Sequence, residues 1–541
     1  MFSNLFEKKN KKQLLINCEK MEKRVALLNN SRLEEYQIER DEERNIAGSV
    51  YLGRIVNYES SLQAAFVDIG TEKNAFLHYW DMLPATYENS EKILFDRKAV
   101  NEKKRTRLNK ESDDFNKYMT NLASKRKRIN INDLPRIFPV GSEIPVQVSK
   151  GPIGTKGPRV TANITLPGRY LVLLPFEEDF GISKKIEDRA ERERLRKIML
   201  ELDIPEGMGC ICRTFGEDRK SVFFKRDIDM LLELWNRGIS ENGRKKAPFV
   251  IFEEPSLIER TARDFLTEDI DEIIVDDENA YLHIKDILGG LVSPKMASKV
   301  HRYSKARPLF EEYGVEKHIA AIYERRIPLE SGGFICIDET EALVAIDVNS
   351  GTNKGKNQAD TIVKTNLEAC DEIARQTRLR NIGGIIVIDF IDMRPAGDRE
   401  AVFKKMKNII KSDRARTKVY PISRLGLMEM TRQRDTESIR EAMFDICPYC
   451  EGRGKVKSAV SMSVEIQRAL NEIIRRYHKD KNFSVRVIMH PTVLARMKNS
   501  DSIFLTEMEK KYSTHISFRG DISVHLEEFK LIDPVTAEEY R

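Results

Sequence analysis

Two apolar runs in the second half of the chain each end in an aspartate, the residue type that binds hard metal ions. The run EALVAIDVNSG carries Asp347 and Asn349, and the run GGIIVIDFIDM carries Asp389. Strand alternation places Asp347 and Asn349 on one face. A set of few oxygen ligands suits a hydrated Mg²⁺ and a phosphate substrate. Acids at strand ends are also ordinary solvated caps, so the residues alone leave both interpretations open.

The segment between these runs, NQADTIVKTNLEACDEIARQTRLRN, has the apolar period of a helix and ends at a glycine-containing stop. Strand, helix and strand in this order predict a parallel pair with a right-handed crossover. Neighbouring parallel strands end at the same edge of a sheet, where α/β proteins bind ligands. We therefore expect Asp347 and Asp389 to converge, with Asn349 between them.

A cysteine pair in CPYCEGRG, Cys447 and Cys450, has the spacing of metal ligands. Zinc takes four ligands, and the chain has no second Cys-x-x-Cys and no histidine close to this one in sequence. The pair would supply half of a tetrahedral site, which two copies of the chain could complete across a two-fold axis. The alternatives are an unmetallated turn and a redox dithiol, although the thioredoxin-type strand–helix context is missing.

Residues 48–83 consist of short apolar strands broken by glycine and polar turns, which predicts a small antiparallel barrel. Phe66 and Phe76 could stack on bases, and Lys150 and Lys156 could contact phosphates, as in single-stranded RNA binding by an OB-type barrel. The alternative, which these residues alone favour, is that both phenylalanines belong to the core. Residues 97–128 hold twelve Lys or Arg against four acids, a basic insertion that would add salt-sensitive phosphate affinity.

The composition is that of a globular protein with several domains. The chain has 541 residues, of which 33% are charged and 40% hydrophobic, with a formal net charge of +6. No apolar run approaches the ~18–20 residues that span a bilayer, and the N-terminus lacks the apolar region of a secretory signal. Seven cysteines, five of them scattered, do not form a disulfide framework. We therefore expect a protein of the reducing cytoplasm.

Long motifs in consistent order resemble the ribonuclease E/G family of endoribonucleases. They include SGGFICIDETEALVAIDVNSG, TNLEACDEIARQTRLRNIGGIIVIDFIDM, ISRLGLMEMTRQR and CPYCEGRG. The stretch YLGRIVNYESSLQAAFVDIG resembles the family's RNA-binding barrel, and GRYLVLLP, GISKKIEDR and EGMGCICRTFG resemble its phosphate-sensor domain. The resemblance covers nearly the whole chain. Because the chain ends soon after the last small domain, it is expected to resemble the ribonuclease G branch, which lacks a scaffold tail.

The resemblance implies an α/β multidomain fold with a DNase-I-like catalytic domain and a split RNase-H-like lobe into which the other domains are inserted. The implied domains are the lobe (1–45 and 259–322), an OB-fold RNA-binding domain (46–162), a 5′-phosphate sensor (163–258), the catalytic domain (323–445), a zinc-link (446–458) and a small dimerisation domain (459–541).

The family's site residues map onto this chain position by position. The resemblance implies that Asp347 and Asp389 bind the catalytic Mg²⁺, with Asn349 in support, and that Cys447 and Cys450 bind zinc shared between protomers. The implied RNA-channel residues are Phe66, Phe76 and Lys156. The implied 5′-monophosphate sensor consists of Gly168, Val172, Arg213, Thr214 and Arg416. One departure is Lys184-Lys185, where arginines are usual, so phosphate contacts there are expected to be looser.

The expected activity is Mg²⁺-dependent hydrolysis of single-stranded RNA, which leaves 5′-phosphate and 3′-hydroxyl ends and is stimulated by a 5′-monophosphate. The expected substrates are rRNA precursors and mRNA, in rRNA processing and mRNA decay, and the expected assembly is a zinc-linked dimer or tetramer. A non-catalytic, zinc-linked RNA-binding scaffold is the first alternative. A metal-dependent DNase is the second, and the RNA-type barrel disfavours it.

Overall fold

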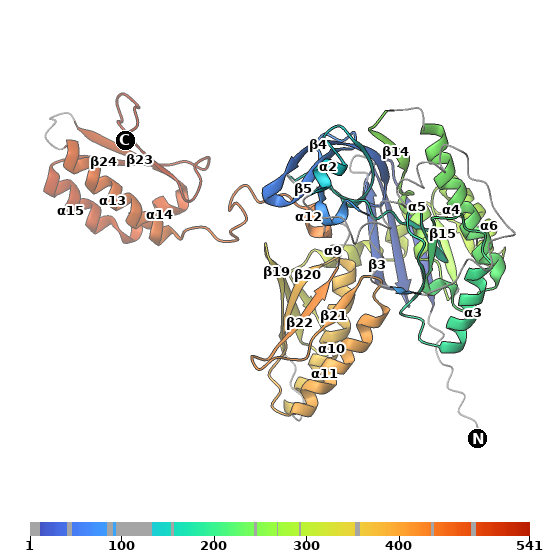
Figure 1. Cartoon of the computed structure of the whole chain (residues 1–541). Helices are drawn as coiled ribbons and strands as arrows, with labels where there is room; N and C mark the ends of the chain where they lie inside the picture. The colour runs from blue at the N-terminus through green and yellow to red at the C-terminus, as the bar shows by residue number, and fades with distance from the viewer. Residues whose placement is uncertain are drawn as a thin grey trace, which may run out of the picture. The chain divides into compact units, whose positions relative to one another are not determined.

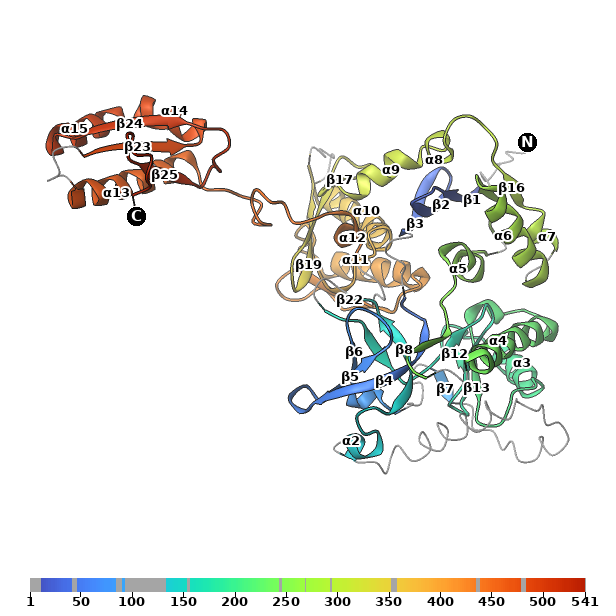
Figure 2. The same ribbon diagram turned by 90° about the horizontal axis from the view of Figure 1, so that it is seen from above.

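A computed structural model of the chain separates into two compact units, residues 1–442 and 443–541, which are treated one at a time (Figures 1 and 2). The expected basic insertion, 97–128, lies outside the residues that the structure describes. These residues are 11–40, 46–83, 90–92, 133–152, 156–242, 246–267, 269–291, 294–351, 358–433, 438–477 and 483–540.

The first sheet of unit 1 combines two distant stretches of the chain, those that the prediction places in one lobe. Strands β1, β15 and β16 run parallel, and β2 and β3 extend the sheet through an antiparallel hairpin. The polar cluster Asn29-Asn30-Ser31 between two strand-like stretches predicts a hairpin turn, and Asn30 and Ser31 form it, both at positive φ. The elements are β1 (Lys12–Cys18), β2 (Glu22–Asn29), β3 (Arg32–Arg40), α5 (Leu257–Asp264), β15 (Glu272–Val275), α6 (Glu278–Leu291), α7 (Pro294–Ala297), β16 (Val300–Arg302), α8 (Leu309–Glu312) and α9 (Val315–Ile322).

Five strands close into a barrel, as the glycine-broken apolar runs predict, but one pair, β6 with β9, is parallel rather than antiparallel. The order is β4, β5, β6, β9, β8, and β8 pairs back with β4. Strand β14, from far along the chain, pairs with the same β4. The elements are β4 (Val50–Glu59), η1 (Ser60–Leu62), β5 (Ala64–Asp68), β6 (Ala75–His78), η2 (Tyr79–Asp81), α2 (Leu134–Ile137), β8 (Glu143–Lys150), β9 (Arg159–Thr161) and β14 (Phe249–Phe252).

The third sheet lies in the range expected for the phosphate sensor and shares a large core with α3 and α4. Its order is β10, β11, β13, β12, β7, in which β7 comes from residues before the basic insertion. The elements are β7 (Ser90–Lys92), β10 (Leu166–Pro167), β11 (Leu171–Leu174), β12 (Phe180–Ser183), α3 (Arg189–Leu200), β13 (Gly209–Cys212), η6 (Thr214–Gly216) and α4 (Ser221–Asn242).

The fourth sheet carries both aspartate runs. Its order is β17, β18, β19, β20, β22, β21, and only β19 and β20 are parallel neighbours, joined by the predicted helical crossover. Helices α10 and α11 lie against one face of this sheet (Figure 1), and the core between them and the sheet buries alternate residues of the strands. The elements are β17 (Arg326–Pro328), β18 (Phe334–Glu339), β19 (Leu343–Asn349), α10 (Gln358–Leu379), β20 (Gly384–Asp389), α11 (Ala396–Ile409), η7 (Ile410–Ser412), β21 (Thr417–Val419), β22 (Leu427–Arg432) and α12 (Ile439–Met443).

The second unit is a small α/β domain. Strand β23 lies between β24, its parallel neighbour, and β25, its antiparallel neighbour, and three helices complete the core. The elements are α13 (Ala459–Tyr477), β23 (Ser484–Met489), α14 (Pro491–Ser500), α15 (Ser502–Tyr512), β24 (His515–Gly520) and β25 (Phe529–Ile532).

Among the helices that the structure describes, none has the length and apolar character needed to cross a bilayer. All seven cysteines are free thiols, in agreement with the expectation that they form no disulfide framework.

A buried ion pair ties β22 to the loop before β21. Arg432 Nε donates to Asp413 Oδ2 over 2.8 Å, and Arg432 Nη1 donates to the Ile382 carbonyl over 2.8 Å. The two side chains are 7% and 6% exposed. Burial alone would raise the pKa of Asp413, but the hydrogen bonds and charge of Arg432 outweigh it, so that the pKa lies below its ordinary value.

Replacing Asp413 by alanine is expected to destabilise unit 1 by about 3–5 kcal/mol, because Arg432 keeps a buried, unpaired charge. The contribution of Asp413 is complete at neutral pH and is lost as the pH falls through its lowered pKa. Thermal unfolding measures the loss. Asp371→Ala, which removes an exposed ion pair with Lys405, is the control and should cost less than about 1 kcal/mol. Equal shifts in the two variants would contradict the assignment.

Candidate active site

Asp347 and Asp389 are direct neighbours at the carboxyl ends of β19 and β20. Parallel strands lie about 4.8 Å apart, so the two backbones hold the carboxylates side by side. Along β19, Val344, Ile346 and Val348 are buried while Asp347 is exposed. The register therefore places both acids on the sheet face opposite the core under α10 and α11. The expectation that the two aspartates converge is confirmed.

Asn349 lies on the same strand as Asp347 and donates a hydrogen bond from Nδ2 to Asp347 Oδ2 over 2.8 Å. It thus fixes the orientation of one carboxylate. The pKa of Asp389 lies above its ordinary value because of partial burial and because the charges of Asp347 and Asp392 oppose its ionisation. A divalent cation would relieve this repulsion.

The donor chemistry of this site fits a hard cation. Two carboxylates with a supporting amide match the few-ligand, water-rich coordination of Mg²⁺. Among the described residues, no group of three or more His, Cys, Asp or Glu side chains forms a metal cluster. A cation bound between Asp347 and Asp389 would therefore keep several water ligands.

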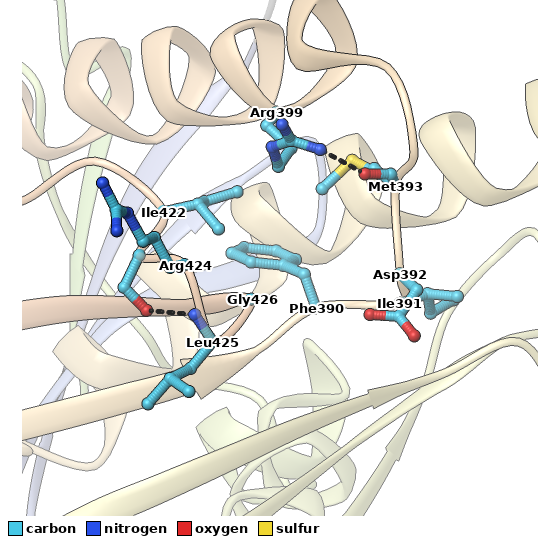
Figure 3. A pocket seen from close by; sticks show the side chains of 10 residues that line it. Phe390, Ile391, Asp392, Met393, Arg399, Ile422, Arg424, Leu425 and Gly426 are labelled. Carbon is cyan, nitrogen blue, oxygen red and sulfur yellow. Dashed lines mark hydrogen bonds between the residues drawn. The ribbon is translucent and has the colours of Figure 1, made fainter.

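A cavity of about 480 Å³ lies just beyond Asp389 (Figure 3). One wall comes from the connection between β20 and α11, and the other from the connection between β21 and β22. The sequence analysis did not identify it, although the ISRLG motif forms one of its walls. The lining residues are Phe390, Ile391, Asp392, Met393, Arg399, Ile422, Ser423, Arg424, Leu425 and Gly426.

The cysteine pair lies in unit 2, in a tight turn that Glu451, Gly452 and Gly454 build with positive φ. Backbone N–H groups of Cys450 and Tyr449 and the Cys450 side chain lower the pKa of the exposed Cys447 thiol, which favours the thiolate that binds metals. By contrast, burial raises the pKa of Cys370 to about 12. Residues 451–458 separate the pair from α13, so this fully described stretch lacks the strand–helix context of a redox dithiol.

Phe66 and Phe76 face each other on β5 and β6, with ring centroids 6.0 Å apart in an edge-to-face arrangement. Both are half-buried and lie outside the barrel core, so the alternative that they are core residues is wrong. His78 follows on the same face, 6.5 Å from Phe76 between ring centroids. Sequence reasoning missed His78, which the period of two along β6 could have indicated. Lys150 and Lys156 are both exposed.

Arg213 follows β13 and reaches across to two acceptors. Its guanidinium donates to the Gly168 carbonyl and, over 2.7 Å, to Asp264 Oδ1, and its side chain is 25% exposed. Gly168 admits no larger residue, because a Cβ there would lie 2.6 Å from an oxygen of Asp227. The sequence analysis missed Asp264. Its pKa is lowered because Arg263 and Arg213 outweigh the effect of burial.

The remaining residues of the expected sensor differ from one another in how far they are buried. Val172 on β11 pairs with Ile211 and is half-buried, whereas Thr214 is exposed. Arg416 is exposed in the loop before β21. Lys185 is one of the two lysines that stand where the family usually has arginines. Its Nζ donates a hydrogen bond to the Asp413 carbonyl over 3.0 Å, which joins the sensor segment around residues 180–188 to the loop before β21.

Two family models match the chain. The model described as the ribonuclease E/G family matches residues 165–435, and the one described as the RNase E/G thioredoxin-like domain matches residues 446–534.

Curated relatives align over nearly the full length of the chain. Ribonuclease G of Escherichia coli strain K12 is 35% identical over 521 residues, which is 96% of this chain and 99% of that protein. Ribonuclease G of Haemophilus influenzae is 34% identical over 522 residues, which again cover 96% of this chain and 99% of that protein. Ribonuclease E of Haemophilus influenzae is 36% identical over 93% of this chain but only 50% of its own length. By this coverage and by both family models, the chain belongs to the ribonuclease E/G family and is similar in extent to ribonuclease G.

Proposed function

We propose that the chain is an Mg²⁺-dependent endoribonuclease that hydrolyses phosphodiesters in single-stranded RNA. The observation that carries this proposal is the parallel register that sets Asp347 beside Asp389 on an exposed sheet face. The names of the full-length relatives, all ribonucleases, support RNA as the substrate. An RNA-binding scaffold without catalysis is the alternative. It is disfavoured because adjacent carboxylates repel phosphate and serve no purpose in a binding protein.

In this mechanism Asp347 and Asp389 would hold the cation, and Asn349 keeps one Asp347 oxygen oriented through its 2.8 Å hydrogen bond. When bound, Mg²⁺ polarises a phosphodiester and lowers the pKa of a bound water. In hydrolysis the oxygen of water would form a bond to phosphorus while the bond between phosphorus and the 3′-oxygen breaks, and the 3′-oxygen would leave with a proton from that water. The products would therefore carry 5′-phosphate and 3′-hydroxyl ends. The exposed sheet face leaves the carboxylates accessible to a polynucleotide.

Substrate selection would lie in the barrel and the sensor sheet. Phe66 and Phe76 offer aromatic faces and edges outside the core, on which only unpaired bases can stack, while Lys150 and Lys156 would contact the backbone. Arg213, oriented by the Gly168 carbonyl and Asp264, would bind a 5′-monophosphate. Thr214, Val172 and Arg416 complete the proposed sensor.

Cys447 and Cys450 would bind zinc together with the same pair of a second copy, giving a dimer or tetramer. The proposed physiological roles are rRNA processing and mRNA decay in the cytoplasm, as the family resemblance implies. The RNase-H-like, DNase-I-like and zinc-link designations of the domains belong to the same proposal.

Asp389→Asn is expected to reduce cleavage at least about a hundredfold while RNA affinity changes little, because the variant loses a metal-binding charge but no RNA-binding surface. Gel-based cleavage and fluorescence anisotropy with one unstructured oligoribonucleotide measure the two quantities. Asp371→Asn removes an exposed acid from α10 and should cleave like the wild type. Retained turnover in Asp389→Asn would remove this residue from the mechanism.

Arg213→Ala should abolish the preference for 5′-monophosphorylated over 5′-hydroxyl RNA, since it removes the oriented guanidinium. Asp264 keeps Arg263 as a partner, at 2.9 Å, so the surrounding structure should persist. The measurement is the ratio of cleavage rates on the two substrates. Lys197→Ala, which removes an exposed positive charge from α3, is the matched control. An equal loss on both substrates would indicate misfolding rather than loss of sensing.

The combined change Cys447→Ser and Cys450→Ser is expected to release zinc and to lower the oligomeric state. Elemental analysis and light scattering on the same sample measure both. Cys18→Ser, in unit 1, should change neither. Unchanged mass and zinc content in the double variant would refute a zinc site shared between copies.

A further inference from the structure

The cavity beyond Asp389 has the size and position of a substrate subsite (Figure 3). Its volume of about 480 Å³ lies within the range of about 300–1,000 Å³ that is typical of small-molecule sites. Asp389 pairs with Leu427, and the lining residues 390–393 and 422–426 lie next to these two positions in sequence. A ligand in the cavity would therefore lie at the same edge of the sheet as a substrate bound at the two aspartates.

The two arginines of the cavity differ in how they are engaged. Arg399 Nη1 donates to the carbonyls of Met393 and Arg394 over 2.7 and 2.9 Å, so it serves to hold this connection in place. Arg424 is exposed, and its side chain forms no hydrogen bond or ion pair with any other residue that the structure describes. Arg424 is thus the cation that a ligand can reach.

The cavity has apolar walls and opposite charges on its two sides. Phe390 is buried beneath it, Ile422 is half-buried, and Leu425 is 84% exposed, a large apolar residue that the fold leaves in water. Asp392 also lines the cavity, and Figure 3 shows Arg424 and Asp392 on opposite sides of the Phe390 ring. A ligand with an anionic part near Arg424 and a flat apolar part matches this distribution.

A rigid turn presents Arg424 and Leu425. Ser423 N–H donates to the Leu427 carbonyl over 2.8 Å, Gly426 N–H donates to the Ser423 carbonyl over 3.1 Å, and Gly426 has a φ of +85°. The Leu425 N–H also donates to Ser423 Oγ over 3.3 Å. Because the turn is already formed, binding incurs little entropic cost of ordering this loop.

We propose that this cavity binds the RNA nucleotide next to the scissile phosphate, with Arg424 contacting that nucleotide's phosphate and Leu425 and Ile422 contacting its base. This inference rests on the proposed endoribonuclease function and adds a subsite that positions the strand. A nucleotide supplies both the anion and the flat, partly apolar ring that the cavity accommodates, and guanidinium–phosphate bonds are charge-assisted.

The test uses the full-length protein and a 5′-monophosphorylated, unstructured oligoribonucleotide with one mapped cleavage site. One substrate series carries a single neutral methylphosphonate linkage at successive positions, and a second carries a single abasic nucleotide. For the wild type, we expect one methylphosphonate and one abasic position, both adjacent to the cleavage site, to slow single-turnover cleavage about tenfold through the loss of cavity contacts.

Arg424→Ala should cleave the unmodified RNA about tenfold more slowly than the wild type. A methylphosphonate at the adjacent position should not slow this variant further, whereas methylphosphonates at other positions should affect its cleavage rate as they affect that of the wild type. Leu425→Ser should also slow cleavage of the unmodified RNA, and an abasic nucleotide at the adjacent position should not slow this variant further. Both side chains are exposed, so folding should be preserved, and unfolding curves check this. Lys407→Ala removes a positive charge from the last turn of α11, away from the cavity, and should match the wild type in both series.

If Arg424→Ala and Leu425→Ser cleave every substrate of both series at the wild-type rate, the proposed subsite is overturned while the proposed function remains intact. If instead the wild type cleaves no RNA with Mg²⁺, the proposed function fails. The subsite is then still tested by the affinities of the same oligonucleotides in EDTA. Identical affinities of the wild type and Arg424→Ala for every oligonucleotide would overturn it.

Discussion

The parallel pairing of β19 with β20 is the constraint on which the rest of the candidate site depends. The register sets Ile346 beside Ile388 in the core and Asp347 beside Asp389 on the exposed face. A shift of one residue along either strand would move its aspartate into the core and its isoleucine into water. Burial of apolar side chains under α10 and α11 therefore holds two like charges next to each other. Partial burial and the nearby charges of Asp347 and Asp392 both raise the pKa of Asp389, so its surroundings oppose ionisation.

Helix α10 does more than connect these two strands. Asn366, fully buried on it, donates to the Ile391 carbonyl over 2.8 Å and accepts from the Ile391 N–H over 3.1 Å. This pair of bonds fixes the chain just after Asp389, where the cavity begins. Further along the helix, Glu372 is buried and binds Arg375 and Arg32, the latter from the hairpin of the first sheet. One helix thus fixes both the β20 edge and the contact between two sheets.

The spacing of apolar and turn residues correctly predicted those elements whose structure depends on residues close together in the sequence. The strand–helix–strand unit around residues 343–389 and the hairpin at Asn30 follow from apolar period and turn chemistry, because each depends on residues that are close in sequence. Alternation could place Phe66 and Phe76 on shared faces of their strands, but could not tell the core face from the outer one. The family resemblance, not the pattern, favoured the outer face.

Apart from His78, which the alternation along β6 could have indicated, the missed features arise from contacts between residues far apart in sequence. Asp264 lies 51 positions from Arg213, on a helix of a different sheet, and nothing local to either residue indicates the pairing. Strand β14 completes its hydrogen bonds on β4 of the barrel rather than within the adjacent sensor sheet. The cavity requires two connections that only β20–β22 pairing brings together. Such features depend on tertiary packing, which single-sequence patterns do not encode.

A continuous set of contacts runs from the sensor segment to the cavity. Lys185 binds the Asp413 carbonyl, Asp413 pairs with Arg432 at one end of β22, and the other end of β22 adjoins Gly426. Transmission of a signal along this route would need an element with two alternative states. A buried ion pair within a six-stranded sheet is instead rigid, since breaking it leaves a charge uncompensated. The proposed 5′-phosphate site would then act by tethering one end of the RNA, which raises the local concentration of the remaining strand at the two aspartates.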